Sequence, residues 1–198
     1  MKKSDNCRAC RKAGEKLFLK GLKCSLPSCP VTKRSYAPGQ AGAKRRVRRG
    51  SDYSVQLAEK QKARAIYGIS EKQMLSCFNE ARKQRSSTGE QLISLLERRL
   101  DNVVFRSGWA SSRDAARQLV THGKVNLNSK RVKSPAHLVD LNDEVSFTMP
   151  SEGKKKSDLP KWLNSDKSAT SVKVGAMPIK EDANLVFNEQ LIIEFYSR

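Results

Sequence analysis

The apolar residues that follow residue 50 recur at the three- and four-residue spacing of amphipathic helices. The first helix is expected to begin at Ser51 or Ser54 and to end at Gly68. Ser70 and Gln73 have the spacing of a capping box, which predicts the start of a second helix. In the first helix Val55, Ala58 and Lys62 are expected on one side, with Leu57, Ala65 and Ile66 nearby, and the second helix presents Met74, Cys77, Phe78 and Ala81 at helical spacing.

Two more helices are predicted before the pattern changes to that of strands. Thr88 with Gln91, and Ser111 with Asp114, have capping-box spacing, and Gly123 favours the end of the second of these helices. The apolar side chains expected in the core are Leu92, Ile93, Leu95, Leu96 and Leu100 in the earlier helix, and Ala115, Ala116, Leu119 and Val120 in the later one.

Alternation of apolar and polar residues then predicts short strands. One is expected over 124–128, a second over 130–132 after a turn at Asn128 and Ser129, and a third around Val145 and Phe147. Helices followed by strands indicate an α+β unit. The C-terminal residues are unusually apolar and are expected to dock on a core, because exposing them to water is unfavourable.

The chain is therefore expected to be α+β, with a mainly helical first domain and an inserted small α+β domain. The predicted divisions are a cysteine-containing module and basic arm over 1–50, the helical part of the first domain over 51–88, the α+β domain over 89–150, a loop-rich connection over 151–182, and a C-terminal segment returning to the first domain over 183–198.

The net charge of the chain indicates what kind of partner it binds. The formal net charge is +19, which implies a polyanion, with nucleic acid first and an anionic membrane surface second. Residues 1–50 contain fifteen Lys and Arg but only two acids. No apolar run is long enough to span a bilayer, and the first residues lack the apolar core of a signal peptide. We therefore expect a cytoplasmic protein with reduced thiols and no membrane partner.

Residues 30–50 contain several Pro and Gly residues, and their apolar residues do not recur at a regular helical or strand spacing. They are interpreted either as a solvated tail or as an extended arm that becomes ordered on RNA phosphates, and the density of like charge favours the arm. Its cations are Lys44, Arg45, Arg46, Arg48 and Arg49.

Four cysteines precede this arm, spaced Cys7-x2-Cys10, thirteen residues, then Cys24-x4-Cys29. Two close pairs across a short loop are typical of a structural zinc site with four thiolates. A two-disulfide arrangement is the alternative, and the absence of a secretion signal favours metal. We expect one structural Zn²⁺ and no catalytic metal.

The helix after Ser111 offers a second candidate site. Arg113 and Arg117 lie four residues apart and hence on one face, and the helix start could accept a phosphate. An ordinary basic surface is the alternative, and the lack of interleaved aromatics argues against a base-stacking platform. The further candidates are Ser112, Gln118, His122, Lys124, Lys130 and Arg131.

The segments ERRLDNVVFRSGW at 97–109 and SRDAARQLVTHGKVNLN at 112–128 closely resemble the RNA-binding domain of the ribosomal protein S-four family. The segments YAPGQ at 36–40, QLAEKQK at 56–62 and LIIEFYSR at 191–198 resemble other parts of the same family, and the four cysteines resemble its zinc-bearing bacterial variant. The chain departs from the family at Ser129, where Gly usually follows Asn, and at Ala41, where His is frequent. The resemblance adds Arg106 and Asn128 to the candidate RNA contacts.

The resemblance implies a structural constituent of the small ribosomal subunit, located in the cytoplasmic ribosome. Family members bind small-subunit rRNA early and nucleate assembly of its 5′ domain. They lie near the mRNA entry channel beside ribosomal proteins three and five, influence translational accuracy, and in some cases repress their own operon. The implied partners are rRNA, mRNA and those two proteins.

Two other classes of protein carry similar features. A pseudouridine synthase can use the same RNA-binding domain, but residues 1–88 leave little room for a catalytic domain, and no nucleophile–base pair is visible. A zinc-containing DNA regulator is compatible with the cysteine spacing, but no recognition helix accompanies it. The sequence therefore predicts a non-enzymatic RNA-binding protein.

Overall fold

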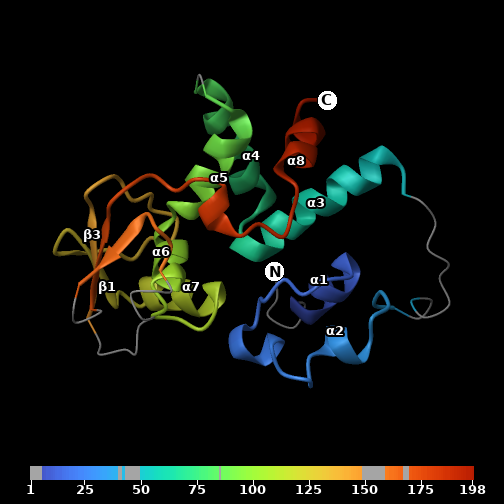
Figure 1. The fold of residues 1–198 in the computed structure, drawn as a ribbon, viewed down its shortest axis with the longest axis horizontal. Coiled ribbons are helices and arrows are strands. Elements are labelled where there is room, and N and C mark those ends of the chain that lie inside the picture. Colours follow the sequence, from blue (N-terminus) through green and yellow to red (C-terminus); the bar gives the residue numbers. More distant parts are fainter. Residues whose placement is uncertain (1–5, 40–41, 43–49, 85, 149–158, 167–169) are drawn as a thin grey trace. The chain divides into compact units, whose positions relative to one another are not determined.

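The computed structural model of the chain describes residues 6–39, 42, 50–84, 86–148, 159–166 and 170–198 (Figure 1). The chain divides into two compact units. The first unit contains Met1–Phe78 and Val186–Arg198, and the second contains Asn79–Leu185.

Within the described residues the first unit is built from helices. They are α1 Asn6–Ala13, η2 Gly21–Cys24, α2 Pro30–Lys33, α3 Asp52–Tyr67, α4 Glu71–Lys83, whose last turn belongs to the second unit, and α8 Glu189–Tyr196. Ser51 caps α3 by accepting the N–H of Ser54 at 3.4 Å, and Gly68 ends this helix with a φ of +63°. Ser70 and Gln73 exchange the two hydrogen bonds of the predicted capping box.

The buried face of α3 differs from the face expected from the sequence. Gln56 and Lys60 are buried, whereas Val55 is 44% exposed and Ala58 is also exposed. Gln56 and Lys60 are polar, so the spacing of residues along the helix does not show that they are buried. Such groups need partners when they are buried, and Gln56 Nε2 donates to Glu194 of α8 at 3.0 Å.

Lys60 finds its partners in the start of α4 and in α8. Its Nζ donates to Glu71 Oε1 at 2.8 Å and lies 4.0 Å from the centroid of the Phe195 ring. The hydroxyl of Tyr196 donates to the same Glu71 oxygen at 2.7 Å. A carboxylate and an aromatic face together offset the cost of burying the ammonium group. The C-terminal helix is thus joined to α3 by polar contacts as well as by apolar packing.

These contacts shift the pKa values of two groups. Partial burial raises the pKa of Tyr196, and its hydrogen bond to Glu71 raises it further. Partial burial also raises the pKa of Glu71, but hydrogen bonds from Lys60 and Tyr196 and the charges of Lys60 and Arg64 outweigh burial and leave it below the ordinary 4.5. The stabilising contribution of Glu71 is present above its unfolded pKa and is lost as the pH falls through its lowered folded pKa.

Tyr196→Phe is expected to destabilise the folded chain by about 1 kcal/mol at pH 7, because it deletes a hydrogen bond to a carboxylate. The folded pKa of Tyr196 lies above the unfolded value of 10.0, so its contribution is present below pH 10 and is lost as the pH rises beyond it. The variant should therefore also lose less stability between pH 9 and 11 than the parent does. Urea unfolding at several pH values measures both effects.

Tyr53→Phe is the matched control for this prediction. The Tyr53 ring lies 5.6 Å from that of Phe195, and the residue is 50% exposed. An equal loss of stability and an equal alkaline response in the two variants would contradict the role assigned to the Tyr196 hydroxyl.

The second unit combines helices with an antiparallel sheet, which confirms the predicted α+β class. Its elements are α5 Thr88–Glu97, α6 Leu100–Arg106, α7 Arg113–Thr121, β1 Val125–Leu127, β2 Lys130–Arg131, β3 Glu144–Phe147, β4 Leu163–Ser165, β5 Ser171–Val174 and η4 Glu181–Ala183. The strand order is β2-β1-β3-β5-β4, and every neighbouring pair is antiparallel. The register places Leu127 opposite Val145, and Val145 opposite Val172.

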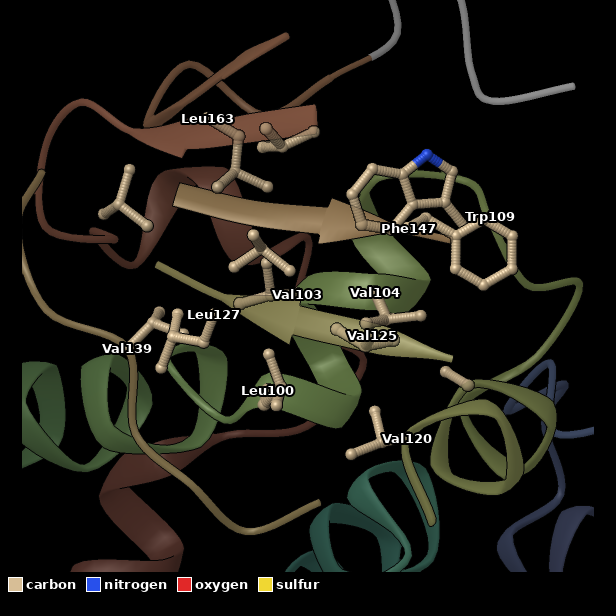
Figure 2. Close-up of a cluster of buried hydrophobic side chains, with 14 of the residues drawn as sticks. Leu100, Val103, Val104, Trp109, Val120, Val125, Leu127, Val139, Phe147 and Leu163 are labelled. Atoms are coloured by element: carbon tan, nitrogen blue, oxygen red, sulfur yellow. The ribbon is translucent and has the colours of Figure 1, made fainter. Parts of the chain in front are cut away.

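One apolar core holds α6 and α7 against the sheet (Figure 2). Leu100, Val103 and Val104 of α6 meet Val125 of β1, and the Trp109 and Phe147 rings stack with centroids 5.6 Å apart. Trp162 and Leu163 extend this core to the β4 side of the sheet. The helix α7 is thereby fixed on the sheet by its own apolar side.

The structure differs from the sequence expectations at two helix starts. The N-cap of α7 is Ser112 rather than Ser111, and Ser87 precedes α5 where Thr88 was expected to cap it. Adjacent hydroxyl residues offer two caps one position apart, and the sequence pattern does not choose between them. Strands β4 and β5 also lie within 151–182, where no strand was assigned, because two runs of three and four residues carry too little alternation to be recognised.

Candidate nucleic-acid interface

Two candidate arginines, Arg113 and Arg117, share one side of α7, but this side is half-buried. From the sequence, this side was expected to expose both arginines. The structure turns it toward α6, because Ala116, between them in the chain, belongs to the buried core. Ser112 is only 8% exposed, and its Oγ accepts the N–H of Ala115 at 3.2 Å. Its side chain therefore serves as the helix cap.

The carboxylate of Glu97 lies behind this side of α7, and its side chain is 1% exposed. Arg106 donates to its two oxygens from Nε at 2.9 Å and from Nη2 at 2.8 Å, and Asn102 Nδ2 donates at 2.7 Å. Arg113 Nη2 lies 4.0 Å from the same carboxylate, and Arg113 Nε donates to Asn102 Oδ1 at 2.8 Å. The Arg113 guanidinium also covers the Phe105 ring at 4.6 Å. Arg106 is thus engaged inside the unit, whereas Arg113 is held by these contacts with 19% of its side chain still exposed.

Asp101 provides a second buried carboxylate with a similar arrangement. Arg99 donates to it from Nε at 3.1 Å and from Nη2 at 2.7 Å, and both side chains are almost fully buried. Arg117 Nη1 lies 3.8 Å from Asp101 Oδ2, and the Arg117 side chain is 39% exposed. The N–H of Asp101 donates to the carbonyl of Pro135, which holds the start of α6 in place. Asp101 therefore links a buried arginine to a half-exposed one.

Exposed polar side chains continue from α7 to the β1–β2 hairpin. Gln118 is exposed on α7, and His122 is exposed at its C-cap. Lys124 and Lys130 are exposed immediately before β1 and at the start of β2. We call Arg113, Arg117, Gln118, His122, Lys124, Lys130 and Arg131 the cationic surface.

Arg131 closes this surface by packing on the end of α7. Its Nη2 donates to the carbonyl of His122 at 3.1 Å. The C-terminal end of a helix carries partial negative charge, which favours a cation at this position. Gly123 has a φ of +65°, and a Cβ there would lie 2.2 Å from Arg131 Nε. The absence of a side chain at position 123 therefore allows the guanidinium to lie on the backbone.

The side chain of Asn128, a candidate RNA contact, is instead hydrogen-bonded within the protein. Asn128 and Ser129 both have positive φ, +48° and +66°, as the two central residues of a type I′ turn require. The amide of Asn128 donates to Asp143 at 2.7 Å and accepts the N–H of Glu144 at 2.9 Å. Its side chain therefore joins the β1–β2 turn to the start of β3.

The cations predicted for the basic arm lie outside the residues that the structure describes. They are Lys44, Arg45, Arg46, Arg48 and Arg49. The chain just before them is held by Arg11 of α1, which donates from Nε to the Tyr36 carbonyl at 3.1 Å and lies 4.9 Å from the Tyr36 ring centroid. The described approach to the arm is thus tied to the cysteine-containing module.

The four clustered cysteines are free thiols that influence one another. Cys10, Cys24 and Cys29 are buried, and Cys7 is half-buried. Burial raises the pKa of Cys10, an N–H hydrogen bond from Leu17 lowers it, and the neighbouring Cys24, Cys7 and Cys29 raise it further, so the net shift is upward. The thiolate form of Cys10 is therefore disfavoured unless a cation balances its charge.

Backbone N–H groups donate to two of the clustered sulfurs. The N–H of Lys20 donates to Cys24 Sγ at 3.3 Å, as the Leu17 N–H does to Cys10. As the side chains stand in the described part of the chain, no group of three or more His, Cys, Asp or Glu residues forms a ready metal site. The residue types and the donors to sulfur nonetheless fit Zn²⁺, because a dication would offset the mutual repulsion of thiolates.

Two residues that shape the interface were not expected from the sequence. Glu97 and Asp101 have carboxylates whose partners follow only from the fold, although both lie in the segment used for the resemblance. The burial of Lys60 in α3 was not expected either, because its partners Glu71 and Phe195 lie outside that helix. Among the described residues no helix has the length and apolar character to cross a bilayer.

Comparison with family models matches two successive parts of the chain. The model described as "Ribosomal protein S4/S9 N-terminal domain" matches residues 1–97, and that described as "S4 domain" matches residues 98–145. The second match contains α6, α7 and β1 to β3 up to Val145, so β4 and β5 follow it in the chain.

Individual relatives match over nearly their whole length. The chain is 47% identical to "Small ribosomal subunit protein uS4" of Thermus thermophilus, with 97% of this chain and 96% of the relative covered. It is 46% identical to the protein of that name from Halothermothrix orenii, with the same coverage. It is 45% identical to the one from Citrifermentans bemidjiense, with 98% and 97% covered.

Proposed function

The chain belongs to the family of small ribosomal subunit protein uS4, and on this premise we propose that the cationic surface is where its second unit contacts rRNA. The chain is a structural constituent of the small ribosomal subunit that binds rRNA, and it is not an enzyme. The alternative of an RNA-modifying enzyme with the same domain is not favoured, because the relatives match over the whole chain.

A single observation supports the choice of surface. The exposed cations Lys124 and Lys130 adjoin the C-terminal end of α7 and the β1–β2 hairpin, within the residues matched by the S4 domain. Arg131 is held in the same place by the His122 carbonyl. Cations placed on a helix end and a hairpin can follow the phosphates of a folded RNA by shape, without reading bases in the narrow major groove.

The double variant Lys124→Ala/Lys130→Ala is expected to bind small-subunit rRNA roughly tenfold more weakly at 150 mM salt, because each phosphate that is no longer neutralised removes a favourable release of counterions. The slope of log K against log salt should become shallower by about 0.7–0.9 for each such phosphate. Filter binding over a range of salt concentrations measures both quantities.

The matched control is Lys161→Ala/Lys173→Ala, which removes two exposed lysines near β4 and in β5. It should change affinity by less than the first variant and leave the slope closer to that of the parent. Equal effects in the two double variants would show that net charge, rather than this surface, governs binding.

We propose further that the protein helps to nucleate the 5′ domain of the rRNA and lies beside proteins three and five near the mRNA entry channel. Family membership supports this placement, and with it an influence on translational accuracy and, in some members, repression of the operon. The cations Lys44, Arg45, Arg46, Arg48 and Arg49 of the arm are proposed to contact rRNA and incoming mRNA. Crosslinking from the arm in assembled subunits that recovers rRNA but never mRNA would restrict the arm to anchoring.

We propose also that Cys7, Cys10, Cys24 and Cys29 hold one structural Zn²⁺. Their residue type, their pairing along the chain and the N–H groups that face Cys10 and Cys24 support this assignment. When bound, the metal would supply a cross-link for the module and no chemistry, since four thiolates leave no position for water or substrate.

A further inference from the structure

Two carboxylates are buried beside the basic helix α7, where acids oppose the binding of a polyanion. Glu97 ends α5, and Asp101 lies in the first turn of α6. Their side chains are 1% and 6% exposed. Buried carboxylates are costly unless they are paired, and each of these two is paired with arginines.

Each carboxylate contacts two arginines in the same manner. In each case one arginine forms a bidentate, hydrogen-bonded ion pair with the carboxylate. These pairs are Arg106 with Glu97, and Arg99 with Asp101. The other arginine comes from α7 and lies farther away. Arg113 Nη2 is 4.0 Å from Glu97 Oε1, and Arg117 Nη1 is 3.8 Å from Asp101 Oδ2.

These longer contacts are electrostatic attractions that orient the arginine side chains, and they are not hydrogen-bonded ion pairs. They exceed hydrogen-bonding distance, yet the carboxylates are themselves immobilised by the short pairs. Arg117 keeps 39% of its side chain exposed while it faces Asp101. An arginine oriented in this way loses less rotational freedom when a phosphate arrives than an unrestrained one does.

We infer that Glu97 and Asp101 are positioning residues that hold Arg113 and Arg117 in the orientation required for RNA. Glu97 acts on Arg113 directly and through Asn102, whose Oδ1 accepts the Arg113 Nε–H at 2.8 Å. Asp101 acts on Arg117. The inference rests on the proposed RNA-binding function, and it assigns two acids to a surface that attracts phosphates.

The inference predicts a change in RNA affinity that is opposite in sign to the change expected from net charge alone. Asp101→Asn raises the net charge by one, and uniform attraction to a polyanion would then tighten binding. Loss of orientation instead weakens binding, by about three- to tenfold for one side chain that must be ordered on association. Glu181→Gln is the control for the charge change, because Glu181 is exposed in η4 of the same unit. It should stay within about twofold of the parent.

A double-mutant cycle separates positioning from general structural support. Full-length parent, Asp101→Asn, Arg117→Ala and the double variant are titrated with small-subunit rRNA at 150 mM salt, after the active fraction of each has been measured with excess protein. If Asp101 acts through Arg117, Asp101→Asn weakens binding in the parent but has no further effect in the Arg117→Ala background.

Two results would overturn the inference. One is binding by Asp101→Asn as tight as, or tighter than, that of the parent, and the other is an equal loss in both backgrounds. Should Asp101→Asn fail to fold because Arg99 is left unpaired, the cycle of Glu97→Gln with Arg113→Ala decides by the same criteria, since glutamine retains an oxygen for Asn102. If Arg117→Ala and the Lys124/Lys130 variant both bind normally, the proposed surface itself is wrong; if those variants weaken binding while Asp101→Asn does not, only the positioning role fails.

Discussion

Cys10→Ser is expected to abolish the binding of about one equivalent of Zn²⁺ per chain and to unfold the module of residues 6–39. Cys10 is 5% exposed, and the other three cysteines of the cluster each raise its pKa, so it is the buried member whose loss should affect the proposed site most. A zinc ion held by three thiolates and a poor hydroxyl ligand has lost its preferred set of donors.

The size of this effect follows from how little else holds the module together. Leu17 is the only large aliphatic or aromatic side chain buried among the described residues 6–39, whereas Phe18, Leu22 and Leu26 are half or more exposed. So small a core cannot offset the conformational entropy of ordering the segment. Structural zinc contributes about 10–16 kcal/mol of apparent binding energy in small zinc-binding peptides, which makes metal binding and folding one event.

Metal analysis of purified protein and amide hydrogen exchange of α1 measure the two parts of this prediction. The parent should contain about one zinc and protect the α1 amides, and Cys10→Ser should do neither. Cys77→Ser is the matched control, because Cys77 lies in α4, outside the module. A variant that lacks all four clustered cysteines and yet retains a full equivalent of zinc would place the metal elsewhere.

The elements predicted best are those that their own local pattern specifies. The helix α7 and the strands β1 and β3 were expected because each buries a regular set of apolar residues, such as Ala116 and Val120, or Val145 and Phe147. The turn at Asn128 could be predicted as well, because a short polar pair between two alternating runs favours a hairpin. Periodicity within one element was sufficient in these cases.

What the sequence could not show are the pairs of side chains that meet only in the folded chain. Lys60 is buried because Glu71 and Phe195 surround it, and Phe195 lies far along the chain. Glu97 and Asp101 look like solvent-facing acids in a helical pattern until the fold places arginines around them. The candidate arginine Arg113 was therefore found, but its engagement with buried groups was not. A pattern of residue types along a chain contains no information on such partners.

Trp162→Ala is expected to destabilise the second unit by about 3–5 kcal/mol, the usual cost of truncating a fully buried aromatic side chain. Trp162 is 1% exposed and belongs to the single core shared by α6, α7 and the sheet. For a domain of this size the midpoint temperature should fall by roughly 15 °C or more. Far-UV circular dichroism is the better probe, because the variant loses one of only two tryptophans.

Lys161→Ala is the neighbouring control. Lys161 is exposed, so its truncation should change stability by no more than about 0.5 kcal/mol. Its comparison with Trp162→Ala separates the loss of core packing from any local effect of substitution in the chain before β4.

The Trp162 variant also tests whether β4 and β5, which follow the S4 domain match, share one cooperative core with it. Strand β5 lies between β3 and β4, and the carbonyl of Trp162 accepts the N–H of Gly175 at 2.9 Å, directly after β5. If all five strands unfold together, the truncation lowers hydrogen-exchange protection in β1 as much as in β5. If protection falls only in β4 and β5, these two strands unfold separately from the rest of the sheet. The cationic surface beside β1 then does not depend on them for its stability. The continuity of the core from Val125 through Val145 and Val172 to Trp162 favours the cooperative outcome.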